Sequence, residues 1–345
     1  VRRLNDLKMS VPGSSQFAEY LRGAVTASTT FVQAKNGEDF ELNDYASKTL
    51  MIEPTLRTKD ELDEQKEKRD EAFAKTGQQP TLENYDRHFN QERLTPDQTV
   101  AEFTQCVERS VPIVSRALGL EDIPLDYPIN IVSLDDAGWT FHMTYRKEGP
   151  NVDLNVSNRL RWAKGRPEEL SYHEIAGHLL AYSNWKRNVD SGLINPGYGV
   201  IQIPNPISWA DEGIACDLPF LIPELYDSLT PTGKFMAEAY LLNRMVMNNL
   251  HVMANNGTPT EDIKTFAKLY IPFETDARLE RQIDSRSTNP FSRTYQLTYA
   301  DATFYFAKEA KELGQKKSLD LLKAYYHKPL TPPQVKSLIQ ELKEN

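Results

Sequence analysis

The most constraining feature of this sequence is a nearly unbroken series of helical segments after residue 207. Apolar residues recur there at three- and four-residue spacing, which is typical of helices with one buried face. Thr230, Thr258 and Thr331 each stand directly before a proline, a common signal for a helix N-terminus. This pattern predicts a mainly helical protein. The expected helices span residues 207–222, 231–255, 259–269, 273–285, 291–313, 317–327 and 331–343.

Three segments before that series have a different pattern. "YPINIVSL", "WTFHMTYR" and "NVDLNVSN" alternate apolar and polar residues and are separated by the turn signals "DDAG" and "KEGP". They predict a small sheet, so the expected fold class is mainly α with a small β-sheet (α+β). Further helices are expected at 14–35, 58–77 and 95–120. We expect either an N-terminal helical extension over 1–95 followed by a larger domain over 96–345, or one continuous domain.

Composition narrows the range of partners. The 345 residues carry a net charge of −9 with no block rich in Lys or Arg, which argues against nucleic acid as a partner. No apolar run reaches the length of about 18 residues that a membrane span needs. The two cysteines, Cys106 and Cys216, provide no disulfide framework. We expect a cytoplasmic protein; because the chain starts at Val1, a removed leader stays an open alternative.

The stretch "ELSYHEIAGHLLAY" contains His173, Glu174 and His178. In the zinc-hydrolase motif HExxH the two histidines are four residues apart and project from one face of a helix. Here they are five apart, which in a regular α-helix separates the side chains by roughly 140°. Gly177, which stands between them and relaxes the backbone, favours a π-type turn that returns both histidines to one side.

A catalytic zinc usually has three protein ligands, so a third is needed. The stretch "SWADEGIACD" offers Glu212, just past the start of a helix that Ser208 is expected to cap. Glu174 is then free to act as general base. Asp211 and Asp217 are candidates for orienting a metal-bound histidine through its second ring nitrogen. The alternative is an ordinary helix that contains two histidines and a glutamate by chance.

The motifs "YHEIAGHLL" and "WADEGIA" together resemble those of the gluzincin metallopeptidases. The HExxGH form is similar to that of the dipeptidyl-peptidase III family. Over about 127–345, the order "NVDLNV", "HEIAGH", "DEGIA", "ADATFYFAKEA" and "HKPLTPPQVKSLIQEL" resembles the bacterial family catalogued as domain of unknown function 885, although that family's motif proline and extra histidine are missing here. The resemblance implies a gluzincin-like catalytic domain and one Zn²⁺ ion bound by His173, His178 and Glu212.

The resemblance also implies further site residues. Tyr305 matches the family's tyrosine, which could donate a hydrogen bond to an oxyanion; a core tyrosine is the alternative. Arg293 and Tyr295 lie near the family's Arg-Tyr position and are candidates for substrate binding, as is Asn155 in the strand before the motif. The expected activity is metallopeptidase-type hydrolysis of an amide bond in a peptide or peptide-like substrate. Tailoring of a small metabolite at the same site and a non-catalytic scaffold are the alternatives.

Overall fold

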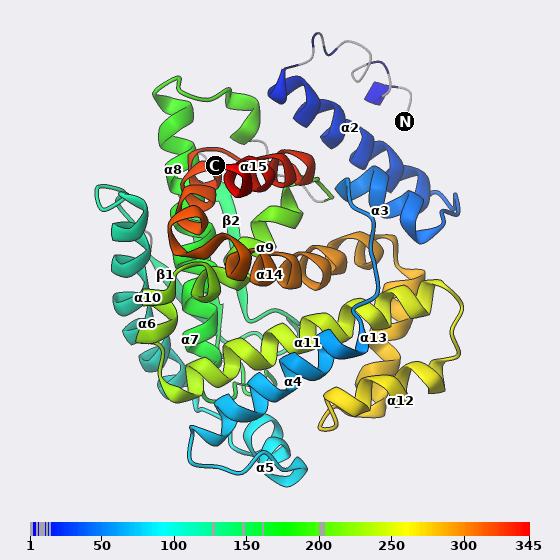
Figure 1. Ribbon diagram of the computed structural model, residues 1–345, viewed down its shortest axis with the longest axis vertical. Coiled ribbons are helices and arrows are strands. Elements are labelled where there is room, and N and C mark those ends of the chain that lie inside the picture. Colours follow the sequence, from blue (N-terminus) through cyan, green and yellow to red (C-terminus); the bar gives the residue numbers. More distant parts are fainter. Residues whose placement is uncertain are drawn as a thin grey trace.

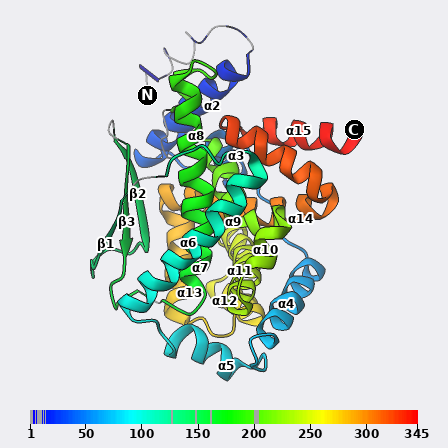
Figure 2. The ribbon, with the colours of Figure 1, turned by 90° about the vertical axis from the view of Figure 1, so that its left-hand side faces the viewer.

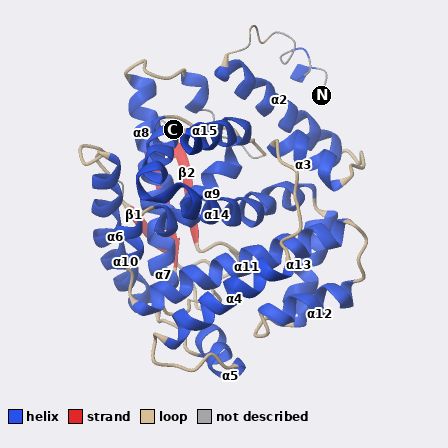
Figure 3. Cartoon of the chain, in the orientation of Figure 1, coloured by secondary structure: helices blue, strands red, loops and turns tan. Residues whose placement is uncertain are grey.

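The structure is a computed structural model that describes residues 15–125, 128–146, 149–160, 162–199 and 204–345, together with residues 3, 4, 6, 11 and 13. Helices dominate this part of the chain, as Figures 1 and 3 show. None of the described helices combines the length and apolar character that crossing a bilayer requires. The α-helices are α2 Gln16–Lys35, α3 Leu42–Leu50, α4 Lys59–Ala74, α5 Leu82–Asp86, α6 Pro96–Leu118, α7 Arg166–Leu170, α8 Leu180–Asp190, α9 Ile207–Leu221, α10 Pro223–Ser228, α11 Pro231–Asn255, α12 Thr260–Tyr270, α13 Asp276–Thr288, α14 Pro290–His327 and α15 Pro332–Glu344.

Local capping sets most of the predicted helix starts. Thr230 accepts a hydrogen bond from the backbone N–H of Gly233 at 2.9 Å where α11 begins. Thr331 stands at the N-cap of α15, where its backbone N–H donates a hydrogen bond to Oε1 of Gln334 at 3.0 Å. Thr258 does not cap α12, whose first residue follows Pro259 without a side-chain cap. Two of the three predicted threonine caps are therefore confirmed.

The helix that carries Glu212 begins differently from the prediction. Ser208 lies inside α9 and does not cap it. Asn205 stands before this helix, and its Oδ1 accepts a hydrogen bond from the backbone N–H of Ile207 at 3.2 Å. Asparagine favours this position because its short side chain reaches the free N–H groups of the first turn.

Two helices predicted separately at 291–313 and 317–327 form the single long element α14, which carries a break at Gly314. This residue has φ 69° and ψ 172°, a conformation that glycine adopts without steric cost. The short helix α3 was not predicted, because Glu41 at its N-cap makes no side-chain hydrogen bond and leaves no capping signal.

The predicted sheet is present as β1 Ile129–Val132, β2 Phe141–Arg146 and β3 Gly149–Asn155. Its strand order is β1-β3-β2, with β1 parallel and β2 antiparallel to β3. Figure 2 shows the sheet at one side of the helices. Val152 and Leu154 share a buried cluster with Ile175 and Leu179, so β3 supports the helix that carries the histidines. Parts of the predicted turn "KEGP" (147–148) and of the loop 195–206 (200–203) lie outside the described residues.

The longest helix, α14, crosses the middle of the molecule and packs against α9 and α11 (Figure 1). The helix α4 lies along α11. The largest buried cluster joins Tyr20, Leu42 and Leu50 to Leu218 of α9 and Leu321 of α14. The helices α2 and α3 thus contribute to the same hydrophobic core as the helices that follow the sheet.

Candidate metal centre

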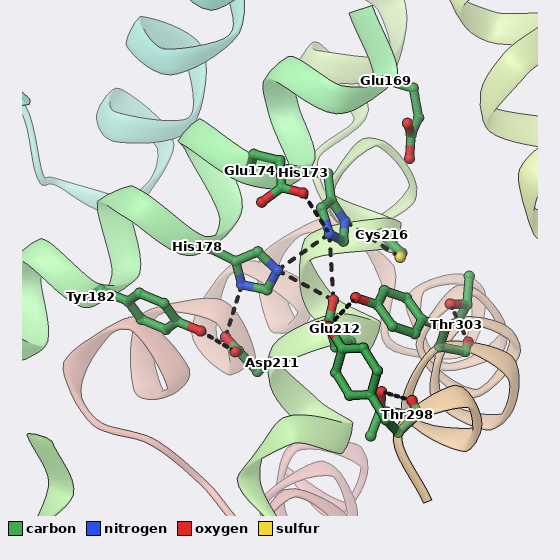
Figure 4. Close-up of polar contacts among 12 residues, drawn as sticks. Glu169, His173, Glu174, His178, Tyr182, Asp211, Glu212, Cys216, Thr298 and Thr303 are labelled. Atoms are coloured by element: carbon green, nitrogen blue, oxygen red, sulfur yellow. Dashed lines mark hydrogen bonds and ion pairs between the residues drawn. The ribbon is translucent and has the colours of Figure 1, made fainter. Parts of the chain in front are cut away.

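The histidine motif lies in a segment of π-helix, Ser171–Leu179, between α7 and α8. In a π-helix the backbone hydrogen bonds join residues five apart, so residues with that spacing lie on one face. The Nε2 atoms of His173 and His178 are 3.3 Å apart, and the two rings are at 90° to each other. The predicted π-type turn is confirmed, and it brings the two histidines together (Figure 4).

Gly177 has a different role from the one that its position in the sequence indicates. It does not adopt positive φ. A Cβ atom at this position would lie 2.8 Å from Cβ and 3.1 Å from Cα of Ala215 in α9. Contacts this short are not tolerated, so the glycine permits the close approach of α9 to the π segment. That approach brings Glu212 to the histidines.

Glu212 completes a triangle of donor atoms. Its Oε2 lies 3.3 Å from Nε2 of His178 and 3.4 Å from Nε2 of His173. Ligand atoms bound to one zinc ion at about 2.0–2.1 Å in a tetrahedral arrangement lie about 3.3–3.4 Å from one another. The three residues are 5–7% exposed, and they are the one group of this kind found among the described residues. Both the spacing and the chemistry of these atoms fit a zinc ion.

The charge distribution of the cluster suits a cation. Burial alone would raise the pKa of Glu212, but His178 and His173 outweigh burial and hold this pKa well below its usual value. The carboxylate therefore stays ionised. Burial also opposes a charge on His178, yet Asp211 and Glu212 raise its pKa well above the ordinary value. Negative charge thus surrounds the histidine nitrogens.

Asp211 holds the ring of His178. Its Oδ1 lies 3.1 Å from Nδ1 of His178, while the hydroxyl groups of Tyr182 and Tyr325 donate hydrogen bonds to the same carboxylate. A histidine that donates Nδ1–H to a carboxylate keeps the lone pair of Nε2 free for a metal. Asp211 therefore lies where a partner of a metal-bound histidine was expected.

His173 has a sulfur partner. The Sγ of Cys216, one turn after Glu212 on α9, lies 3.4 Å from Nδ1 of His173. Asp217, the other candidate for this role, contacts neither histidine. It is fully buried, and burial raises its pKa well above the usual value. The prediction for Asp217 is wrong. This residue follows Cys216 on α9, and one step along a helix turns the side chain by about 100°, away from His173.

Glu174 lies beside the cluster without belonging to it. Its Oε1 is 3.9 Å from Nε2 of His173, and its side chain is 18% exposed, more than those of the three candidate ligands. Burial is the largest influence on Glu174 and raises the pKa of its carboxyl group. This carboxylate is therefore available to exchange protons next to the candidate metal site (Figure 4).

Two tyrosines of α14 reach the site. The hydroxyl of Tyr295 donates a hydrogen bond to Oε1 of Glu212 at 3.1 Å and lies 2.6 Å from the hydroxyl of Tyr299. The ring of Tyr299 stacks on that of His173, with centroids 6.4 Å apart. The sequence indicated Tyr295 but missed Tyr299. The four-residue spacing of the two tyrosines, which places them on one helix face, was the available signal.

Tyr305 lies away from the cluster. Its ring packs against Trp209 at 5.0 Å and against Phe306 at 5.5 Å between centroids. It follows Tyr299 by six residues, which turns it by roughly 240° around the helix. The core tyrosine, which was the alternative, is therefore what the structure contains, and the prediction of a catalytic Tyr305 is wrong.

The other two candidates for substrate binding have structural contacts. Arg293 donates hydrogen bonds to Oδ1 of Asn255 at 2.9 Å and to the carbonyl of Phe40 at 2.7 Å. The amide of Asn155 bonds to the backbone N–H and carbonyl of Leu134, both at 3.0 Å. These groups are occupied in joining segments of the chain, so neither residue is at the metal centre.

Comparison with known proteins identifies a shared fold. No protein-family model matches the sequence, and no curated protein matches it either. Among solved structures, the chain is similar to the crystal structure of a protein from Colwellia psychrerythraea described as a "putative lipoprotein", with 12% sequence identity and a TM-score of 0.65. The alignment covers 93% of this chain and 55% of that one, so the chain spans about half the length of this neighbour. At this identity the similarity concerns the fold alone.

Proposed function

We propose that the protein is a zinc-dependent hydrolase that cleaves an amide bond in a peptide or peptide-like substrate. The observation that carries the proposal is the buried triangle of His173, His178 and Glu212, with edges of 3.3–3.4 Å, beside a separate carboxylate, Glu174. Two histidines and a glutamate are a common ligand set of catalytic zinc. A free carboxylate next to such a set is typical of hydrolases that need a general base.

The three ligands and Glu174 have different roles in the proposed reaction. Zinc bound by the three ligands would supply a Lewis acid that polarises a carbonyl and makes a water molecule acidic near neutral pH. Glu174 accepts a proton from the attacking water and delivers it to the leaving amine. Its raised pKa makes it a better proton acceptor than an exposed carboxylate.

The two tyrosines assist in different ways. Tyr295 holds the second oxygen of Glu212 and fixes the orientation of that carboxylate. Tyr299 is the phenol beside His173, and burial raises its pKa well above the usual value, so its hydroxyl stays protonated. We therefore assign to Tyr299 the hydrogen bond to the substrate oxyanion that the sequence had suggested for Tyr305.

Four variants test this division. Glu212→Ala removes a ligand, so the zinc content should fall, since catalytic zinc is rarely held by two protein ligands. Glu174→Gln keeps the shape but removes the proton acceptor, so zinc should stay while cleavage slows by about 10²-fold or more. Tyr299→Phe should slow cleavage less, and Tyr305→Phe is the matched control without effect. Zinc per chain is measured by elemental analysis, and cleavage by mass spectrometry of a peptide library.

The possible failures are distinct. Loss of zinc in Glu174→Gln with retention in Glu212→Ala would exchange the roles of the two carboxylates. Full activity in both variants would put the active site elsewhere. Wild-type protein that binds one zinc per chain and cleaves no peptide of the library would reject the substrate class while leaving the metal centre.

A further inference from the structure

Two arginines, one in α11 and one in α13, have no acidic partner among the described residues. Arg286 of α13 is 3% exposed, and its Nε and Nη1 have no hydrogen-bond partner in the part of the chain that the structure describes. The Nε of Arg244 in α11 likewise has no hydrogen-bond partner among the described groups. A buried cation without a counter-charge is strongly unfavourable, and buried arginines in proteins are normally paired. Arg166, by contrast, has an ion pair with Glu169.

The two guanidinium groups affect each other. Burial, and then the charge of Arg244, lower the pKa of Arg286 to about 9. The fully buried His251 lies in the same region and brings no negative charge; burial lowers its pKa well below the usual value, and the charges of Arg286 and Arg293 lower it further. The described part of this region therefore carries an excess of positive charge inside the protein.

Arg244 connects this region to the metal centre. Its guanidinium carbon lies 4.6 Å from the centroid of the Tyr299 ring, which in turn stacks on His173. Arg244 also borders a small cavity together with Cys216, the residue that contacts His173. The arginine is half-buried, so a bound molecule can reach it. Only one side chain therefore separates Arg244 from a candidate ligand of the metal.

The acidic residues at this cavity do not supply the missing charge. Glu169 is already paired with Arg166. Asp217 is fully buried, and burial raises its pKa well above the usual value, which favours the neutral carboxylic acid. The cavity itself has a volume of about 10 Å³, which is room for about one water molecule. This cavity has no room for a carboxylate, so a ligand that supplies the counter-charge must approach the partly exposed side of Arg244.

We propose that Arg244, whose positive charge is reinforced by that of Arg286, binds a carboxylate of the substrate next to the metal centre, so that the protein selects peptides with a free carboxylate close to the cleaved bond. The planar fork of a guanidinium group matches the two oxygens of a carboxylate. The carboxylate belongs either to the chain end or to an acidic side chain. This inference rests on the proposed hydrolase function and specifies its substrate.

The test measures binding in zinc-loaded Glu174→Gln protein, which leaves the peptide uncleaved. Three acetylated tripeptides serve as probes: trialanine with a free C-terminal carboxylate, the same peptide as its amide, and an amidated peptide with a central glutamate. Calorimetry should give at least about tenfold tighter binding for one carboxylate peptide than for the neutral amide, as expected for a charge-assisted hydrogen bond. Which of the two peptides binds more tightly identifies the source of the carboxylate.

Further substitutions in the Glu174→Gln protein test which arginine causes the preference for carboxylate peptides. Arg244→Gln should abolish the preference for carboxylate, and Arg244→Lys should retain part of it because lysine keeps the charge but lacks the fork. Arg286→Gln should weaken it; if this buried change unfolds the protein, the partly exposed Arg244 decides the question. Arg281→Gln, at an exposed position of the same helix as Arg286, is the control that keeps the preference. Zinc per chain should stay constant throughout.

Equal binding of all three peptides would overturn the inference, as would an undiminished preference in Arg244→Gln. Cleavage by the wild-type protein that is indifferent to carboxylates would reject this inference alone. A carboxylate preference that depends on Arg244, in a protein that cleaves no peptide, would reject the hydrolase function and keep the carboxylate site.

Discussion

At the scale of single residues, Asp211 fixes the orientation of one candidate metal ligand, His178. It accepts hydrogen bonds from Tyr182 and Tyr325 and lies 3.1 Å from Nδ1 of His178. Its carboxylate is thus fixed from three directions before a metal binds. The His178 ring that this carboxylate holds loses little conformational freedom when it binds a metal, which favours affinity.

Asp211→Asn should lower zinc affinity by about 10- to 100-fold, because the uncharged amide holds the His178 ring less firmly. Asp217→Asn makes the same change on the same helix and should leave the affinity unaltered, since Asp217 contacts neither histidine. Competition with a chromophoric chelator measures both affinities. Equal losses in the two variants would show that the overall charge of α9, and not the contact with His178, sets the affinity.

Zinc affinity should also rise with pH. In the metal-free protein burial opposes a charge on His173, but Cys216, Glu212 and Glu174 outweigh burial and raise the pKa of this histidine to about 10. Zinc binds the deprotonated ring, so each released proton should increase the logarithm of the affinity by about one per pH unit. Dissociation constants between pH 6 and 9 check this; a flat profile would contradict it.

The raised pKa of His173 also affects the stability of the metal-free protein. The folded-state pKa of His173 lies above the unfolded value of about 6.5, so the stabilisation from its proton is complete below pH 6.5 and is lost as pH rises through about 10. Chelated protein should therefore become less stable over that window, while zinc-loaded protein should lose none of this contribution. Thermal unfolding of both forms provides the comparison.

At the scale of elements, the contact between the π segment and α9 determines the metal centre. Gly177→Ala would put a methyl group 2.8 Å from Cβ of Ala215 and push the two elements apart. Overpacking of this kind costs about 1–3 kcal/mol, and zinc affinity should fall with it because Glu212 lies on α9. Adding Ala215→Gly should recover part of both losses. Denaturant unfolding and zinc titration of the single and double variants measure the coupling; strictly additive effects would exclude the contact.

The positions of the three candidate ligands could be predicted from the sequence. The five-residue spacing of His173 and His178 required a widened turn, and "DEGIA" supplied Glu212, since both follow from helix geometry and ligand chemistry. The partners from elsewhere were not predictable in the same way. Tyr299 reaches His173 because α14 packs against α9 at a particular rotation, which depends on side-chain packing across the whole core. The misplaced Tyr305 has the same cause: matching residue types does not fix which face of α14 meets the site.

At the scale of the whole molecule, the segment between α3 and α4 connects the first helices to α14 and α9, the helices beside the candidate metal centre. Arg57 donates hydrogen bonds to the backbone carbonyl and to Oδ1 of Asp301 in α14, the latter at 2.7 Å, and Trp209 of α9 donates to Oδ2 of the same carboxylate at 2.8 Å. Asp301 therefore joins three parts of the chain that are far apart in sequence. The side chains of Arg57 and Asp301 are only 10% and 12% exposed, so water screens this pair weakly.

Arg57→Ala should destabilise the protein by about 3 kcal/mol, because it leaves the carboxylate of Asp301 buried without its cation. Lys48→Ala is the control: it breaks an exposed ion pair with Asp44 and should cost less than about 0.5 kcal/mol. Urea unfolding followed by circular dichroism gives both values. Similar, small losses in the two variants would mean that Trp209 alone satisfies Asp301.

Because the π segment has a wide turn, the direction of α8 does not depend on the one extra residue between the two histidines. In a regular helix one added residue rotates everything after it by about 100°. Here the turn absorbs that residue, so α8 keeps its direction, and Asn184 and Trp185 donate hydrogen bonds to the carbonyls of Tyr326 and Tyr325, both at 2.8 Å. The histidine spacing can thus change by one residue while the flanking helices keep their anchors. Histidines that are four residues apart in a regular helix and five residues apart in a π-helix can present the same donor atoms, so the distances among those atoms identify the site where the number of residues does not.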